Sequence, residues 1–294
     1  MALISNATFS LKTSDIVIAT KMLRSNPDFF EKKNLENAML DLCRGANYVP
    51  AVKAWMQSAS LLGQGKHGSL TQYALEILDH DPEFTKANTW WAVHLLLCMS
   101  EETSPYPECF KILEPTSNKT LSRAEHESRV FELVKANELE RNAKQIEAVV
   151  MSKPYSGVIG SFKFDPNLPL SQLGLFDMEI QKGGVGTIQN ITRTLTKPSD
   201  ATFLFALSLF KFKFFPTSVT IDFQKVDEVG LHYFLGCSKA WLSDKTKMLS
   251  SHITWGEYIN YDPALNLNSL EIKASCIPKT MLKHMLEENV DGWM

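Results

Sequence analysis

The chain has 294 residues, of which 44% are hydrophobic and 21% are charged, and its formal net charge is −3. This composition excludes a disordered chain and is typical of a globular protein with one large domain or several small ones. The small negative charge argues against a histone-like nucleic-acid binder, although it is compatible with a local basic surface.

No segment of the sequence has the pattern of a leader or a membrane anchor. The first six residues lack the basic start and the apolar run of a signal peptide. The most apolar segment, 203–215, contains Lys211 and Lys213 and is shorter than the ~20 residues that span a bilayer. We therefore expect a cytoplasmic protein with no membrane partner. The wide spacing of the cysteines predicts reduced, buried thiols instead of disulfides or a zinc site: Cys43, Cys98, Cys109, Cys237 and Cys276.

Three predicted helices near the N-terminus include a helix-turn-helix. Apolar residues recur at helical spacing over 15–24, 35–42 and 49–56. Gly45 permits a tight turn between the second and third of these helices, and Asn47 is a suitable N-cap residue for the third. We expect the third helix to present these side chains to a partner: Asn47, Tyr48, Ala51, Lys53 and Ala54.

An extended pattern follows the third helix, with leucines on either side of the glycine-rich segment 63–68. We interpret it as two short strands joined by a tip that carries Lys66 and His67, followed by a helix over 73–78. The whole of 35–75 then forms a winged helix-turn-helix, whose second helix enters a major groove while the wing contacts phosphate. Contact with proteins alone is the open alternative, because many winged helices do only that.

A strongly apolar helix is predicted over 89–99, and it carries Trp90, Trp91 and His94. The tryptophans have the chemistry to stack on bases, but their helical spacing favours packing. No second metal ligand stands one turn from His94. We therefore expect His94 to be a hydrogen-bonded core residue.

A second helix pair is predicted over 121–135 and 139–151. Ser122 and Glu125 match a capping box at the start of the first helix. Basic residues lie opposite the apolar stripe of the second helix, which indicates a second nucleic-acid contact. A solvated face is equally compatible with the sequence, because glutamates alternate with these cations. The basic residues are Arg141, Lys144 and Lys153.

Cations outnumber acidic residues between 182 and 225, and this segment begins with the glycine-rich run 183–186. Its backbone amides can approach a phosphate, but no Walker loop is present, so we expect no nucleotide cofactor and a flexible loop remains the alternative. Beyond Thr220, the pattern indicates a third winged-helix-like unit, with helices at 223–226 and 231–241 and strands near 253–259 and 270–274.

The predicted fold class is mainly α with small β-wings (α+β), built of consecutive winged helix-turn-helix-like units. We expect an N-terminal winged-helix DNA-binding domain over 1–115 and a second helix-turn-helix-like unit over 116–180. A C-terminal α+β domain is expected over 181–294.

Three stretches resemble a bacterial family catalogued as a domain of unknown function, which includes SspB-type proteins. The resemblance is densest from 35 to 175 and thin beyond 198, and it departs from the family at Ala46 and Pro50, where basic residues are more common. The stretches are Leu42-x-x-Gly45-x-Asn47-x-Val49-x-x-Val52-x-x-Trp55, Thr89-x-Trp91-x-x-His94-x-x-Leu97, and the segment LPLSQLGL at 168–175.

This resemblance implies a subunit of a bacterial DNA phosphorothioation system that defends against phages. SspB-type proteins nick one strand of double-stranded DNA before sulfur is inserted. The implied partners are an ATPase subunit, an ATP-pyrophosphatase-like sulfur-transfer subunit and a cysteine desulfurase. Two alternatives stay open: a non-catalytic DNA-binding adaptor that recruits those enzymes, and a winged-helix transcription regulator.

A nickase usually holds Mg²⁺ or Mn²⁺ with carboxylates beside a lysine. In this sequence the pattern that fits is Asp262 ahead of a predicted strand that carries Glu271 and Lys273. Residues two apart on a strand point to one side, so Glu271 and Lys273 are expected on one face. A solvated strand with alternating charge explains the same residues, and no other catalytic motif is present.

Overall fold

The structure is a computed structural model that describes residues 9–64, 68–100, 105–138, 153–163, 165, 168–183, 186–262 and 268–288. Within these ranges, the backbone alone is described at 137–138, 153–154, 181–183 and 186–188. No helix in these ranges is both long and apolar enough to cross a membrane.

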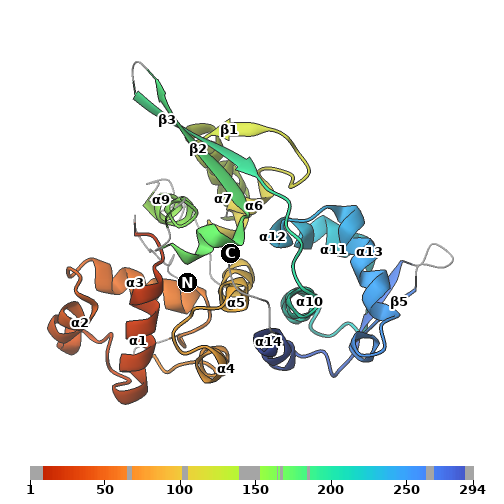
Figure 1. Ribbon diagram of the computed structural model, residues 1–294, viewed down its shortest axis with the longest axis horizontal. Coiled ribbons are helices and arrows are strands. Elements are labelled where there is room, and N and C mark those ends of the chain that lie inside the picture. Colours follow the sequence, from red (N-terminus) through yellow and green to blue (C-terminus); the bar gives the residue numbers. More distant parts are fainter. Residues whose placement is uncertain are drawn as a thin grey trace.

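The N-terminal helices form a group on one side of the molecule (Figure 1). Their bounds confirm the helices predicted from apolar periodicity, with Leu35–Leu42 predicted to the residue. The elements are α1 (Thr13–Ser25), η1 (Lys32–Asn34), α2 (Leu35–Leu42), α3 (Tyr48–Ser58) and α4 (Gln72–His80).

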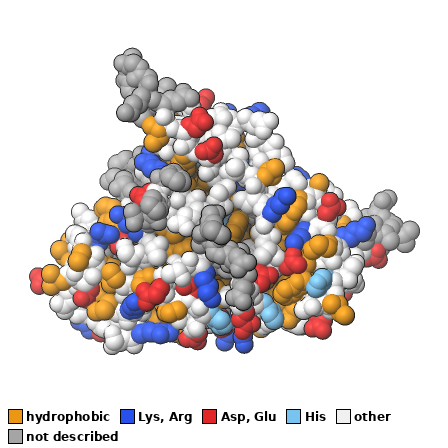
Figure 2. Space-filling model, viewed as in Figure 1, with side chains coloured by type: hydrophobic (Ala, Val, Ile, Leu, Met, Phe, Trp, Pro, Cys, Tyr) orange, Lys and Arg blue, Asp and Glu red, His pale blue; other side chains and the backbone are white. Residues whose placement is uncertain are grey.

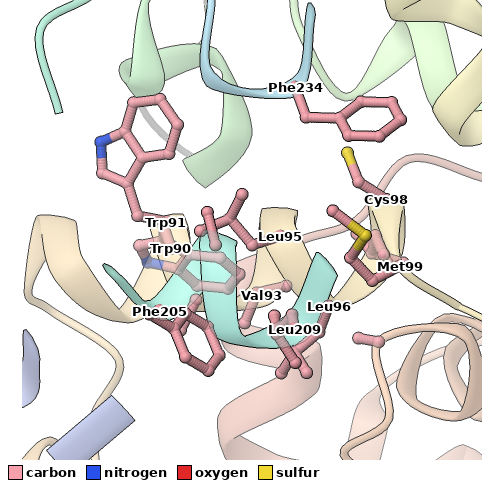
Figure 3. Packing of buried hydrophobic residues seen from close by; sticks show 14 of the residues in the cluster. Trp90, Trp91, Val93, Leu95, Leu96, Cys98, Met99, Phe205, Leu209 and Phe234 are labelled. Atoms are coloured by element: carbon pink, nitrogen blue, oxygen red, sulfur yellow. The ribbon is translucent and has the colours of Figure 1, made fainter. Parts of the chain in front are cut away.

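Three later helices build the centre of the core, and Figure 3 shows part of it. They are α5 (Ala87–Cys98), α10 (Asp200–Phe214) and α14 (Pro278–Glu287). All side chains from Asn88 to Cys98 are buried, so α5 is covered on every side. One hydrophobic cluster extends through all parts of the chain, from Leu11 to Leu286. The tryptophans of α5 belong to it, which confirms the packing interpretation.

A first small sheet lies beside further helices, and its hairpin projects from the body of the molecule (Figure 1). The strands are antiparallel and lie in the order β1-β3-β2. The elements are α6 (Tyr106–Lys111), β1 (Thr120–Ser122), α7 (Arg123–Glu138), α9 (Lys153–Gly160), η2 (Pro169–Leu173), β2 (Phe176–Gly183) and β3 (Gly186–Arg193).

A second small sheet lies at the opposite end of Figure 1 from α1–α3. Its antiparallel strands lie in the order β4-β6-β5, so the strand order of the first sheet is repeated. The elements are β4 (Thr220–Asp222), α11 (Phe223–Val229), α12 (Leu231–Leu235), α13 (Lys239–Ser250), η3 (Trp255–Glu257), β5 (Ile259–Asp262) and β6 (Ser269–Ile272).

The first strands of the two sheets share a buried middle residue and a last residue that caps the next helix. Leu121 in β1 and Ile221 in β4 are buried, and the next residue of each strand caps the following helix. Ser122 Oγ accepts from the Glu125 amide at 3.3 Å, while Asp222 accepts from the Gln224 amide at 3.0 Å. Each three-residue strand therefore anchors a sheet with its middle residue and starts a helix with its last.

A buried arginine joins the two sheet units. The guanidinium of Arg193, at the end of β3, lies 5.1 and 4.8 Å from the ring centroids of Phe110 and Phe176. Its Nη2 donates to the Tyr233 carbonyl oxygen of α12 at 2.6 Å. Burial lowers the pKa of Arg193 to about 10. The first sheet is thus joined to helix α12, which lies between the first strand of the second sheet and its β5–β6 hairpin.

A mainly helical α+β fold with small antiparallel sheets is confirmed. The two ends of the glycine-rich run lie in strands β2 and β3, where Gly183 pairs with Gly186. The strand predicted near 253–259 is wrong. Turns and η3 occupy most of this segment, and strand β5 begins only at Ile259. The three-domain division stays a prediction, and its boundary at 180/181 falls inside β2.

The cysteines are free thiols, as expected, and four of the five are buried. Cys43 is exposed, which corrects the expectation for that residue. It follows α2 directly with a φ of 51°, so it ends the helix in a left-handed conformation.

Candidate nucleic-acid interface

Helix α3, which the sequence predicts to face a partner, is covered along one side by the start of the chain. Ala51 and Ala54, expected on the outer face, are only 2% and 8% exposed. Residues 9–12 lie beside Ala51, and the Trp55 indole donates to the Phe9 carbonyl oxygen at 2.9 Å. The outward placement of these two alanines is therefore wrong. A distant segment packs beside Ala51, and helical periodicity alone does not reveal it.

Tyr48 is half-buried, and its hydroxyl forms a hydrogen bond within the protein. The hydroxyl donates to Asp15 Oδ2 at 2.8 Å, and the ring lies 4.6 Å from that of Phe9. Arg44 forms an ion pair with Asp15 at 3.1 Å and lies 5.0 Å from the Tyr48 ring centroid. Burial first, and then the bond to Asp15, raises the pKa of Tyr48. This cluster joins α1 to α3.

Asn47 and Lys53 lie on the accessible side of α3, exposed and half-buried respectively. Asn47 occupies the N-cap position, but its side chain makes no capping hydrogen bond, which corrects that expectation. Its backbone there is already helical, with φ −76° and ψ −18°, whereas a capping residue usually has extended backbone. Contact of both residues with DNA stays a prediction.

The predicted N-terminal wing is a very short hairpin in the described residues. Leu62 and Leu70 form an isolated antiparallel bridge, and the Gly63 amide donates to the Ser69 carbonyl oxygen at 2.9 Å. The tip residues Lys66 and His67 lie outside the described residues.

The second predicted contact falls largely outside the described residues. Arg141 and Lys144 lie in the undescribed range 139–152, and Lys153 begins α9 without a described side chain. The capping box ahead of them is confirmed, because Ser122 and Glu125 exchange bonds in both directions. The bonds from Ser122 lower the pKa of Glu125.

Helix α13 presents an exposed stripe that sequence reasoning did not find. Lys239, Asp244 and Lys247 are exposed on it, while its opposite side is buried. The sequence pattern merged α12 with the start of α13 into one helix over 231–241. The signals that separate them are Gly236, at φ +62°, and Ser238, whose Oγ accepts from the Trp241 amide at 3.0 Å.

The candidate nuclease residues lie on the second sheet. Asp262 is paired with Ser269, two residues before Glu271 on the neighbouring strand, so both carboxylates lie on the face opposite the buried Leu270. Lys273 follows the strand, and its ammonium donates to the Gly256 carbonyl oxygen at 2.7 Å. The two carboxylates thus share a face, whereas the lysine is bound within the fold.

These residues do not form a metal site by themselves. Across the described ranges, no three His, Cys, Asp or Glu side chains are grouped so that they could hold a metal ion. Asp222, on the same face as Glu271, is occupied in capping α11. The carboxylate pair therefore does not fit a preformed Mg²⁺ or Mn²⁺ site, and we derive no catalytic step from it.

Histidine 94 is a core residue, as the sequence predicts. It is completely buried, its Nε2 donates to the Phe234 carbonyl oxygen at 2.8 Å, and its Nδ1 accepts from the Tyr106 hydroxyl at 2.8 Å. Burial lowers the pKa of His94 to about 3. Both ring nitrogens are in use, so the side chain is not available as a metal ligand.

Charges of both signs are mixed on the molecular face that Figure 2 shows. Lysine and arginine side chains alternate there with aspartate and glutamate, and no broad surface of one sign is visible. Any contact with DNA on this face must therefore use local groups of cations.

Comparison with known proteins gives a consistent result for the family and the fold. The model of a family described as "Protein of unknown function (DUF4007)" matches residues 5–281. Two solved structures, "Magnesium ion-bound SspB crystal structure" and "SspB crystal structure", each have a TM-score of 0.69 at 16% identity. The match covers 99% of this chain and 88% of theirs. No curated protein sequence matches the chain. The chain belongs to the DUF4007 family and has the fold of SspB.

Proposed function

We propose that this chain is a DNA-binding subunit that contacts duplex DNA through winged helix-turn-helix units. One observation carries this proposal: the two small sheets have the same strand order, and each has its helices between the first strand and a terminal hairpin. A helix pair followed by a β-hairpin is the element order of a winged helix. In the C-terminal unit, α11 and α12 precede α13, and β5–β6 forms the wing.

The stripe on α13 is the DNA-contacting surface in this proposal. A recognition helix places its exposed side chains in the major groove, and lysines at its ends reach phosphates. Lys239 lies in the first turn of α13 and Lys247 in the last, both exposed. Asp244 between them repels phosphate and limits the strength of nonspecific binding.

The first prediction tests this surface. We expect Lys239→Glu combined with Lys247→Glu to weaken duplex binding and to reduce the salt slope of log Kd by about two, one for each lost phosphate contact. Fluorescence anisotropy with a labelled duplex at several salt concentrations measures both quantities.

The matched control is Lys279→Glu with Lys283→Glu, which makes the same charge change on the exposed side of α14. It should leave the salt slope unchanged. An equal loss in both double variants would attribute the effect to net charge and would reject α13 as the binding surface.

The finer part of the proposal is strand-specific nicking within a DNA phosphorothioation and defence system. The supporting observation is the fold shared with SspB over 99% of this chain, together with the magnesium ion named in one SspB structure. The ATPase, the sulfur-transfer subunit and the cysteine desulfurase are the proposed partners. An adaptor that recruits these enzymes without nicking is the competing function, and it is compatible with the same fold.

The second prediction separates nickase from adaptor. Purified protein with Mg²⁺ or Mn²⁺ should convert supercoiled plasmid into open circles with little linear product. Glu271→Ala tests the strand candidate: if this carboxylate holds a metal only in the DNA complex, its loss stops nicking while phosphate contacts elsewhere preserve binding. Duplex binding without nicking in either metal would establish the adaptor, and full nicking by a folded Glu271→Ala variant would remove this residue from the site.

A further inference from the structure

A cavity of about 540 Å³ lies between the start of α7 and the β2–β3 hairpin. Its volume is within the range of pockets that bind small molecules, ~300–1,000 Å³. Two of its lining residues, Ile180 and Gln189, belong to the β2–β3 hairpin, which projects from the body of the molecule in Figure 1. Its walls combine basic, acidic, polar and apolar side chains: Ser122, Arg123, Ala124, Glu127, Lys163, Ile180 and Gln189.

Arg123 is held in place by neutral partners. Its Nη2 donates to Ser156 Oγ at 3.0 Å, and its Nη1 donates to Gln189 Oε1 at 3.4 Å. Among the ion pairs of the described residues, none involves Arg123. Two neutral acceptors fix the orientation of the half-buried guanidinium without neutralising its charge, so the side chain is prepared for an anion.

The other walls add a second charge and a nonpolar surface. Lys163 is exposed and contributes another cation, while Ile180 is 63% exposed on the hairpin. Glu127 also lines the cavity. The amide of Glu125, at the start of α7, is bonded to Ser122. The cations that line the cavity are Arg123 and Lys163.

We propose that this cavity binds a single nucleotide, with its phosphate on Arg123 and Lys163. Arginine and lysine together recognise phosphate, and Ile180 supplies apolar surface for the sugar or base. The nucleotide is either free or one unit of a DNA strand, and in the second case the inference rests on the proposed function.

The third prediction is measured by calorimetric titration with 2′-deoxyadenosine 5′-monophosphate, with deoxyadenosine as the ligand that lacks phosphate. We expect the monophosphate to bind and the nucleoside to bind at least tenfold more weakly, since a charge-assisted phosphate contact is worth about tenfold or more in affinity. Arg123→Gln and Lys163→Gln should each lower the affinity for the monophosphate about tenfold. Arg129→Gln, on the exposed side of α7 outside the cavity, is the matched control.

A labelled single-stranded oligonucleotide distinguishes the two sources of phosphate. If the variants bind the oligonucleotide more weakly, but the free monophosphate does not bind the native protein, the phosphate recognised by the cavity is part of a DNA strand. If both ligands lose affinity, the cavity accepts a free nucleotide as well. Unchanged affinity for both ligands in Lys163→Gln, an exposed position that tolerates substitution, overturns the proposal even if Arg123→Gln fails to fold.

The outcome is separable from that of the proposed function. Loss of duplex binding in the α13 variants with normal nucleotide binding supports two independent sites. Nucleotide binding in a protein that does not bind duplex DNA would retain this cavity and reject the DNA-binding proposal.

Discussion

Acidification from pH 7.5 to pH 5 is expected to lower the free energy of unfolding by about 4 kcal/mol through two buried histidines. Burial lowers the pKa of His94 to about 3 and that of His126 to about 4, from an ordinary value of 6.5. Below pH 6.5 the unfolded chain therefore binds protons that the folded chain does not. The contribution of the two histidines to the free energy of unfolding is complete above pH 6.5. It is lost as the pH falls towards the pKa values of the folded state.

The two histidines have the same hydrogen-bonding arrangement, which explains why both must stay neutral. His126 Nε2 donates to the Cys109 carbonyl oxygen at 3.0 Å, and its Nδ1 lies 3.0 Å from the Tyr155 hydroxyl. His94 likewise uses Nε2 on a carbonyl and Nδ1 on a tyrosine. Protonation at Nδ1 would break the bond that His94 accepts from Tyr106. In either histidine it would leave a charge in the apolar core.

Urea unfolding followed by tryptophan fluorescence between pH 7.5 and pH 5 measures this loss. His94→Gln and His126→Gln should each reduce the change in unfolding free energy by about half, roughly 2 kcal/mol, because glutamine does not titrate. His252→Gln replaces an exposed histidine and should retain the full change. A native protein whose unfolding free energy is constant over this range would contradict the argument.

Local patterns in the sequence were sufficient for much of the fold. The bounds of α2 and the capping box at Ser122 follow from spacing within a few residues, and the core role of His94 follows from the lack of a neighbouring ligand. The hairpin β2–β3 was missed, although its signal is present. Apolar and polar residues alternate from Phe176 to Gln181, and a two-residue connection lies between Gly183 and Gly186.

Most of the candidate sites depend on contacts that no local pattern contains. Ala51 has the spacing of an outer residue on α3, but residues 9–12 cover it from nearly forty positions away. The nucleotide cavity brings together the start of α7, Lys163 and the β2–β3 hairpin, and this combination exists only in the folded chain. Burial and cavity walls are tertiary properties, so single-sequence periodicity does not predict them.

The second large effect is expected at the turn between α4 and α5. Asp81 is 4% exposed, and its carboxylate accepts four hydrogen bonds within the next eight residues. Oδ1 accepts from the Thr85 amide at 2.9 Å and its hydroxyl at 3.0 Å, while Oδ2 accepts from the Lys86 amide at 2.9 Å and the Thr89 hydroxyl at 2.6 Å. This carboxylate fixes the turn that leads into the central helix α5.

Asp81→Ala should lower the free energy of unfolding by about 4 kcal/mol, measured by urea denaturation at pH 7.5. Hydrogen bonds to a charged group contribute about 1.5–3 kcal/mol each, and the loss leaves buried donors without acceptors. Asp81→Asn separates the effect of the lost hydrogen-bond acceptor from the effect of a smaller side chain. One carboxylate oxygen is replaced by an NH2 group, which cannot accept the two bonds made there, so Asp81→Asn should recover less than half of the loss despite its nearly identical shape.

Two further variants bracket the result. Thr89→Val removes one donor to the carboxylate and should cost about 1–2 kcal/mol. Asp79→Ala, two residues before Asp81, removes an exposed ion pair with Arg24 and should cost less than about 1 kcal/mol, because surface ion pairs contribute little. An Asp81→Asn variant as stable as the native protein would contradict this argument. The hydrogen bonds that the carboxylate accepts would then contribute little, and the packing of α5 would hold the turn.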